Sequence, residues 1–383
     1  MKKQIIVLLS NTVTLFALVG IFINVSPYIS KPLTAFSSGL IKLSAPTVIS
    51  EDVKEVFSSY IKTDNTDTVI TDTEQNEEVF NSINSKDSED DTDIQQTPDD
   101  VLALMKEAEE NFNESDAVGK TSEEAYQGGG TIISYKDIEI QSKIPADVYY
   151  PDIKALLDED SDLSIKDKSK PTVLIYHSHT SESYALLDVG LYNSSDASSK
   201  DPSKNMVRIG DEIKRYLEKY GFNVIHDTEI HDTDYNNSYA DSRKNVEKYL
   251  EEYPSIEVTI DVHRDDITYQ NKTKVKPTQI INGKKAARMM LISGCEYNRV
   301  KNFPDWEENL KFDLHVQQKV NEMYPGLMRP ILFSERKYNM YETHYSFLVE
   351  VGTDANTLEE ACYSGRMFGN ALGKLLSEKY VKD

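Results

Sequence analysis

The sequence predicts an α/β domain with a mostly parallel central sheet flanked by helices over residues 126–383. From residue 131 onward, apolar segments typical of strands alternate with amphipathic segments long enough for helices, which is the pattern of this fold class. Two features precede the domain: a long uncharged run near the N-terminus, and a strongly acidic stretch with few apolar residues. They predict a membrane anchor and a disordered linker.

Residues 1–28 are expected to form a short cytoplasmic stub and one transmembrane helix. Lys2 and Lys3 precede an uncharged run from Ile5 to Val25, and a hydrocarbon core of about 30 Å needs roughly 20 helical residues. A cleaved signal peptide is the alternative, but its apolar region is shorter and ends at a small-residue cleavage site that is not evident here. We favour an anchor that keeps the lysines in the cytoplasm and exports the rest of the chain as a single-pass membrane protein.

Residues 29–125 are expected to be an extracytoplasmic flexible linker. Residues 61–120 hold 18 Asp and Glu against four Lys, and such a segment buries too little apolar surface to offset chain entropy. Val101–Phe112 has only a weak helical pattern, and the three glycines at 128–130 are read as the entry to the domain. The formal charge of −23, without a Lys or Arg cluster, excludes a nucleic-acid binder.

Within the domain, the strand and helix signals alternate in order. The expected strands are Thr131–Ile140, Thr172–His177, Phe222–His226, Ile256–His263, Arg288–Ser293, Ile331–Phe333 and Tyr345–Glu350. The expected helices are Lys204–Tyr220, Ser238–Glu252, Asp305–Tyr324 and Thr357–Lys379. Cys295 and Cys362 lack the spacing of a zinc-binding or redox pair, so we expect two buried free thiols.

All seven histidines follow residue 170, and two of them end the first apolar strand. His177 and His179 are two apart, so their side chains point the same way if the strand continues to residue 179. Glu182 follows within one turn. The carboxyl end of a strand is where open α/β sheets place ligands, so this segment is a candidate site.

Two further strand ends carry similar residues. Asp261 and His263 end one strand, where either Asp261 or Asp265 could orient the histidine ring. His344 and Glu350 are an even number of residues apart, which predicts a shared strand face. The apolar surroundings of Glu350 predict a raised pKa that suits a general base.

Two histidines and a carboxylate are the usual protein ligands of a catalytic zinc ion, which lowers the pKa of bound water to about 7. Histidines that satisfy structural hydrogen bonds are the alternative reading. A serine hydrolase is disfavoured because no Gly-x-Ser-x-Gly motif is present.

At these clusters the sequence resembles the stage II sporulation protein P family, the membrane-anchored cell-wall amidases of endospore-forming bacteria. The segments that carry the resemblance lie within about 172–375: Tyr176–Tyr184, Asn205–Gly210, His231-Asp232 with Ser238-Tyr239, Asp261–Asp265, and Leu348–Gly352 with Asn356-Thr357. The resemblance implies a bacterial zinc amidase-like fold. It also implies a zinc-dependent N-acetylmuramoyl-L-alanine amidase that cuts the amide between glycan and stem peptide, with endopeptidase activity on cross-links also credited to the family.

The resemblance also assigns roles to residues. His179 and His263 match the zinc histidines, and Glu350 matches the catalytic glutamate. Glu182 is our choice for the carboxylate ligand, because Asn205 stands where related enzymes have theirs; His177 is the substitute. Arg264 would hold a substrate carboxylate or else pair with Asp261 or Asp265, and His344 would assist at the transition state or orient another group.

The resemblance implies partners and a location as well. These are peptidoglycan, a lytic transglycosylase, a membrane scaffold of the engulfment machinery, and the cell membrane, with the domain facing the space between the membranes around the forespore. Two other classes of function stay open: a non-catalytic peptidoglycan-binding module and a zinc endopeptidase.

Overall fold

The computed structural model describes residues 90–125, 128–159 and 161–382. The expected transmembrane helix and most of the expected linker lie outside these residues. No helix within the described ranges has both the length and the apolar character to cross a membrane.

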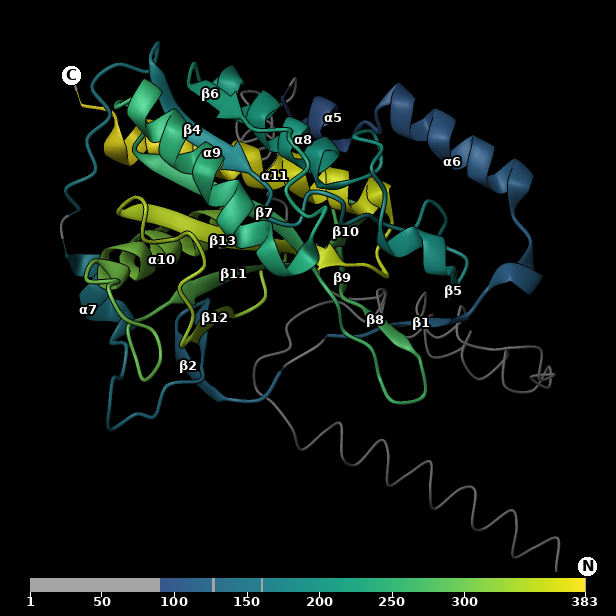
Figure 1. The fold of residues 1–383 in the computed structure, drawn as a ribbon, viewed down its shortest axis with the longest axis horizontal. Coiled ribbons are helices and arrows are strands. Elements are labelled where there is room, and N and C mark those ends of the chain that lie inside the picture. Colours follow the sequence, from purple (N-terminus) through teal and green to yellow (C-terminus); the bar gives the residue numbers. More distant parts are fainter. Residues whose placement is uncertain (1–89, 126–127, 160, 383) are drawn as a thin grey trace, which may run out of the picture. The chain divides into compact units, whose positions relative to one another are not determined.

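Figure 1 shows the described part as a central sheet with helices on both faces. The helices are α5 Asp90–Gln95, α6 Asp99–Asn111, α7 Ile153–Asp158, α8 Met206–Lys219, α9 Ser238–Glu252, α10 Trp306–Met323 and α11 Leu358–Leu375, followed by a π-helical turn at Leu376–Tyr380. Short 3-10 turns are Glu114–Asp116, Ser194–Ala197 and Tyr235–Asn237. The strands are β1 Gly119–Glu123, β2 Thr131–Tyr135, β3 Ile138–Ser142, β4 Pro171–Tyr176, β5 Leu191–Tyr192, β6 Asn223–His226, β7 Val258–Asp265, β8 Lys274–Lys276, β9 Thr278–Ile281, β10 Lys284–Ala287, β11 Met289–Gly294, β12 Ile331–Ser334 and β13 Tyr345–Thr353.

The main sheet of the described region is mixed, with strand order β2-β3-β12-β11-β13-β7-β4-β6. Strands β6, β4, β7 and β13 are parallel to one another. Strand β11 runs antiparallel to β13, and β12 and β3 follow the direction of β11. The expected mostly parallel sheet is thus two parallel blocks of opposite direction, with β2 antiparallel to β3 at one edge. The carboxyl ends of β4, β7 and β13 therefore meet at one edge.

The two faces of the sheet carry different residues because side chains alternate along each strand. On β7, Val258, Ile260 and Val262 belong to the main apolar core with residues of α8, α10 and α11. The opposite face packs on α9, which contacts β4. Thr259, Asp261 and His263 alternate with the three core residues and therefore lie on the α9 face, as does Glu350 on β13, which alternates with Val349 and Val351.

The expected strand Thr131–Ile140 is a hairpin instead. Strands β2 and β3 pair antiparallel, and the turn between them places Lys136 at a φ of 55°. A turn at Lys136-Asp137 carries no glycine or proline, so the sequence pattern did not reveal it.

The expected boundary of the folded domain at residue 126 is wrong, because α5, α6 and β1 belong to the fold. Ile94 and Val101 are 1% and 0% exposed and join the main core. Strand β1 pairs with β5 and β8 in a small second sheet. The linker prediction therefore fails for residues 90–125, although a helix near Val101–Phe112 is confirmed.

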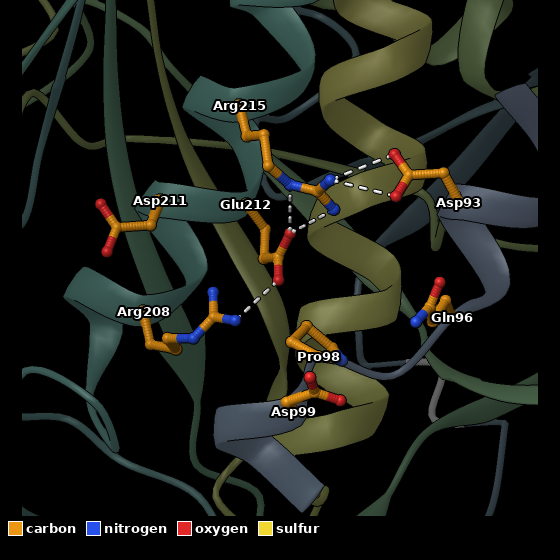
Figure 2. A pocket seen from close by; sticks show the side chains of 8 residues that line it. All are labelled: Asp93, Gln96, Pro98, Asp99, Arg208, Asp211, Glu212 and Arg215. Atoms are coloured by element: carbon orange, nitrogen blue, oxygen red, sulfur yellow. Dashed lines mark hydrogen bonds and ion pairs between the residues drawn. The ribbon is translucent and has the colours of Figure 1, made fainter.

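Charge complementarity explains why this acidic segment is ordered. Asp93 pairs with Arg215 at 3.1 Å, and Asp100 pairs with Arg208 at 2.8 Å. Figure 2 shows Arg215 between Asp93 and Glu212, the buried carboxylate to which Arg208 also points. The fully buried Arg366 of α11 donates to the Ile94 carbonyl at 2.6 Å. Cations of α8 therefore hold acids that the sequence suggested were solvated, and Arg366 of α11 holds the backbone of the same segment.

Candidate active site

A pocket of about 450 Å³ opens where β4, β7 and β13 end. Histidine, carboxylate and tyrosine side chains from segments far apart in the sequence meet in it. It is lined by His179, Ser181, Glu182, Ala197, Ser198, Asp232, Tyr235, Tyr239, His263, Arg264, Asp265, Asp266, Tyr338 and Glu350.

The pairing of β7 with β13 places two of the expected residues side by side. His263 and Glu350 are register partners in this parallel pair. The register shifts between Glu350 and Thr353, where Gly352 has a φ of 67° and a Cβ would lie 2.5 Å from the Asn356 side chain. The Glu-Val-Gly sequence therefore shifts the register of β13 against β7 immediately after Glu350, because only glycine fits at position 352 without strain.

The ring of His263 is held between two carboxylates. Its Nε2 is 2.9 Å from Asp261 Oδ1, and its Nδ1 is 3.5 Å from Glu182 Oε2. Burial by itself lowers the pKa of His263, but the attraction of Asp261 and Glu182 outweighs burial and raises that pKa well above its ordinary value. Of the two residues expected to orient this ring, Asp261 does so. Asp261 in turn accepts from the Ser178 amide at 2.8 Å and hydroxyl at 2.6 Å.

His179 reaches the same pocket because the chain turns after β4. Its ring is 5.3 Å from the ring of His263, and its Nδ1 is buried without a hydrogen-bond partner. Burial is the main cause that lowers the pKa of His179. Tyr235 stacks on this ring at 4.2 Å. A neutral imidazole with an unpaired ring nitrogen is suited to bind a cation.

Glu182 lies close enough to join the two histidines. Besides facing His263, its carboxylate accepts from the backbone amide of Arg264 at 3.2 Å. Burial raises the pKa of Glu182, but the hydrogen bond from His263 and the charge of Arg264 outweigh burial and lower it overall. Glu182 is therefore an anion beside both histidine rings.

Glu350 is a half-buried carboxyl group of the pocket. Its Oε2 has no hydrogen-bond partner. Burial first, and the negative charge of Asp265 second, raise the pKa of Glu350 to about 8. The raised pKa agrees with the expectation from the apolar strand that carries Glu350. A pKa of about 8 lies close to neutral pH.

His177 does not line the pocket. Strand β4 ends at Tyr176 and the chain turns from residue 178. The expectation that the side chains of His177 and His179 point the same way is therefore wrong. His177 is fully buried toward α8, where its Nε2 is 2.8 Å from His226 Nε2 and its Nδ1 is 3.0 Å from the Val262 carbonyl. A Cβ on Gly210 would lie 2.4 Å from the His226 ring, so this histidine pair needs glycine in α8.

His344 lies far from the pocket. It precedes β13, whereas Glu350 lies near that strand's carboxyl end, six residues further on. The His344 side chain is 63% exposed and its Nε2 is 3.2 Å from Asp305 Oδ2. The expectation that His344 assists at the transition state or orients another group of the site is therefore wrong, since six residues of strand span about 20 Å.

Arg264 lines the pocket but uses its guanidinium to tie loops together. It donates to the carbonyls of Ser183 at 3.3 Å and Ala197 at 2.7 Å. Neither the Asp261 nor the Asp265 carboxylate is its partner in the described structure; Asp265 instead pairs with Arg329 at 3.0 Å. Arg329 is a site-proximal residue that the sequence analysis missed.

Three tyrosines of the pocket were also missed. Tyr235 opens the 3-10 turn before α9, Tyr239 lies in the first turn of α9, and Tyr338 lies between β12 and β13. Tyr239 stacks on Tyr338 at 4.7 Å. The Ser238-Tyr239 pair was noticed only as part of a resemblance; aromatic residues at the start of a helix otherwise look like core residues.

Within the described ranges, no set of three or more His, Cys, Asp or Glu side chains has donor atoms placed to hold a metal ion. The donor types nevertheless fit zinc. Ligand atoms about 2.0–2.2 Å from a tetrahedral zinc lie roughly 3.3–3.5 Å apart, and the Nδ1 of His263 and the Oε2 of Glu182 are 3.5 Å apart. The unpaired Nδ1 of His179 supplies a third donor.

Fold and pocket together define a mixed α/β protein with a histidine–carboxylate site at the strand ends. The chain belongs to the stage II sporulation protein P (SpoIIP) family, whose model matches residues 45–373. It is 30% identical over 279 residues to stage II sporulation protein P of Bacillus subtilis (strain 168), and the match covers 66% of this chain and 64% of that protein.

Two solved amidase structures are also similar. N-acetylmuramoyl-L-alanine amidase AmiC2 of Nostoc punctiforme is 11% identical, with a TM-score of 0.30 and coverage of 56% of this chain and 96% of that chain. The N-acetylmuramoyl-L-alanine amidase from Clostridium difficile 630 is 15% identical, with a TM-score of 0.30 and coverage of 54% and 96%.

Proposed function

We propose that this protein is a membrane-anchored peptidoglycan hydrolase of sporulation. It cleaves the amide bond between N-acetylmuramic acid and L-alanine. The observation that carries the proposal is the pairing of His263 with Glu350, a carboxyl group with a pKa of about 8 and a buried, unpaired oxygen, at the edge of an open pocket. Membership in the stage II sporulation protein P family supports a role in sporulation.

His179, Glu182 and His263 would hold one zinc ion. When bound, zinc lowers the pKa of a coordinated water and polarises a carbonyl. Asp261 fixes the ring of His263 and leaves its Nδ1 facing Glu182. Such a partner on the far ring nitrogen is the usual support for a metal-binding histidine.

Glu350 would act as general base and then as general acid. Its pKa of about 8 lies near neutrality, where a carboxyl group can both accept and return a proton. Glu350 would take a proton from the attacking water and give it to the amine as the carbon–nitrogen bond breaks. Endopeptidase activity on cross-links would use the same groups, since it also breaks an amide.

Two variants of the full chain test these assignments. Glu350→Gln is expected to lower the rate of stem-peptide release at least 100-fold and to keep the zinc content of the wild type. His263→Ala is expected to lose both activity and zinc. Equal activity in Glu350→Gln would contradict the role of Glu350. A wild type that binds sacculi and cuts no bond would favour a binding module instead.

We also propose that residues 1–28 anchor the domain in the cell membrane and that the domain acts outside the cytoplasm. During engulfment it would face the space between the forespore membranes. A lytic transglycosylase and a membrane scaffold would be its partners there, since amide cleavage and glycan cleavage together dissolve a wall.

A further inference from the structure

We propose that Tyr239 is a second catalytic residue of the pocket. Its phenol hydroxyl donates a hydrogen bond to the carbonyl oxygen of the scissile amide as that oxygen gains negative charge. The inference rests on the proposed amide hydrolysis and adds a protein donor from α9 to it.

The ring of Tyr239 is fixed by aromatic neighbours on several sides. It stacks on Tyr338 with centroids 4.7 Å apart, and it lies parallel to the His263 ring at 6.2 Å. Its contact with His179 is edge-on at 5.3 Å. Its backbone carbonyl is held as well, by the side-chain amide of Asn339 at 3.2 Å. A side chain so confined loses little entropy when it binds substrate.

The hydroxyl of Tyr239 is free to bind a ligand. No described residue is hydrogen-bonded to it. The hydroxyls of two neighbouring tyrosines are engaged: that of Tyr184 donates to the Val351 carbonyl at 2.8 Å, and that of Tyr338 accepts from Arg336. Partly buried tyrosine hydroxyls usually have a partner, so an unpaired one that lines a pocket suggests a partner in the substrate.

The position of Tyr239 suits a donor to the reacting amide. It lines the pocket together with His179, His263 and Glu350, the groups proposed to bind the metal and to move the proton. In the addition step a water oxygen bonds to the carbonyl carbon, and the electron pair of the C=O double bond moves to the oxygen. Glu350 takes the water proton and returns it to the leaving nitrogen as the C–N bond breaks. Tyr239 keeps its proton and only donates a hydrogen bond.

The test compares the full chain with its Tyr239→Phe variant on soluble glycan strands that carry stem peptides. Loss of a hydrogen bond that forms only in the transition state is expected to lower kcat and kcat/KM equally, by about 100- to 1,000-fold. Zinc content and Tm are expected to stay at wild-type values. Tyr380→Phe is the matched control, because the Tyr380 hydroxyl is also unpartnered but lies outside the pocket, at the C-terminal end of the fold.

Rescue separates the hydroxyl from the ring. The variant that carries para-aminophenylalanine at position 239 restores an N–H donor and is expected to regain part of the lost kcat. An unchanged kcat in Tyr239→Phe, or a rise in KM alone, would overturn the inference. So would a loss of zinc or Tm in Tyr239→Phe that the donor variant does not reverse. A wild type that releases no stem peptide would overturn the proposed function itself.

Discussion

At the scale of single residues, the pocket combines one acid that has a buried, unpaired oxygen with a set of fixed histidine rings. Glu350 has no hydrogen bond at Oε2, while the ring of His263 is engaged at both nitrogens. Leaving a buried carboxyl oxygen unpaired costs about 1–3 kcal/mol or more. A protein tolerates such a cost where the group must exchange a proton, which is the role proposed for Glu350.

A second buried acid lies outside the pocket and gives a test of stability. Burial raises the pKa of Asp313 on α10 well above its ordinary range, and the nearby Ser293 hydroxyl offsets this only in part. Its carboxyl oxygens make no hydrogen bond of good geometry. Because the pKa of Asp313 is higher in the folded than in the unfolded state, this group does not lower the free energy of unfolding below its unfolded pKa of about 4. As the pH rises above that value, the free energy of unfolding declines.

Asp313→Asn is therefore expected to raise the free energy of unfolding at pH 7 by about 1–3 kcal/mol, since the amide needs no proton to remain neutral. At pH 4 the variant and the wild type should differ little. Urea denaturation at both pH values measures this. A variant that is less stable than the wild type at pH 7 would show that Asp313 is charged in the folded state.

Part of the site was predictable residue by residue. His179, His263 and Glu350 stand at ends of strongly apolar strands, and strand periodicity placed Asp261 and His263 on one face. His177 and His344 were misplaced for different reasons: β4 ends at Tyr176, one residue before His177, whereas His344 precedes β13 and lies six residues of strand away from Glu350. Strand boundaries are set by turns and by pairing partners, which periodicity does not specify.

At the scale of elements, α5 and α6 hold α8 and α11 together from outside the sheet. Asp93 and Asp100 pair with arginines of α8, and Arg366 of α11 donates to the Ile94 carbonyl. The sequence analysis assigned these residues to a linker because their composition is acidic. The partners that neutralise those acids lie more than 100 residues further along the chain, so composition could not reveal them.

Val101 and Leu102 of α6 provide a matched test of this packing. Val101 is 0% exposed and Leu102 is 47% exposed. Val101→Asp is expected to lower the free energy of unfolding by about 3–5 kcal/mol, because it buries an unpaired charge. Leu102→Asp should change it by less than about 0.5 kcal/mol.

Chemical denaturation of the two variants measures this difference. Similar stability of both would mean that α6 detaches from the domain in solution. A destabilised Val101→Asp variant would also indicate that truncation at residue 126 destabilises the domain. A chain that begins there lacks α5, α6 and β1 and leaves Arg366 without its backbone acceptor.

At the scale of the whole molecule, the fold places the residues of the candidate site at one edge of one face of the main sheet. The order of the strands was not predictable, because β11 reverses direction beside β13 and the sequence does not encode which strands pair. That strands and helices alternate was predictable, since each expected helix of the domain is confirmed within a few residues.

Attachment to a membrane is a prediction at this scale too. A chain that lacks residues 1–28 is expected to move from the membrane fraction to the soluble fraction of lysed cells, because its long apolar run is gone. The complete chain should require detergent for extraction. Immunoblots of the two fractions measure the difference, and extraction of the complete chain by salt alone would contradict an anchor.

Mass spectrometry of the soluble products from purified sacculi tests the central proposal most directly. The complete protein, supplied with zinc, is expected to release stem peptides with a free alanine amino group and to leave intact glycan strands. Removal of zinc by a chelator should abolish this release. Peptides opened only at their cross-links, or equal release after chelation, would contradict a zinc-dependent amidase.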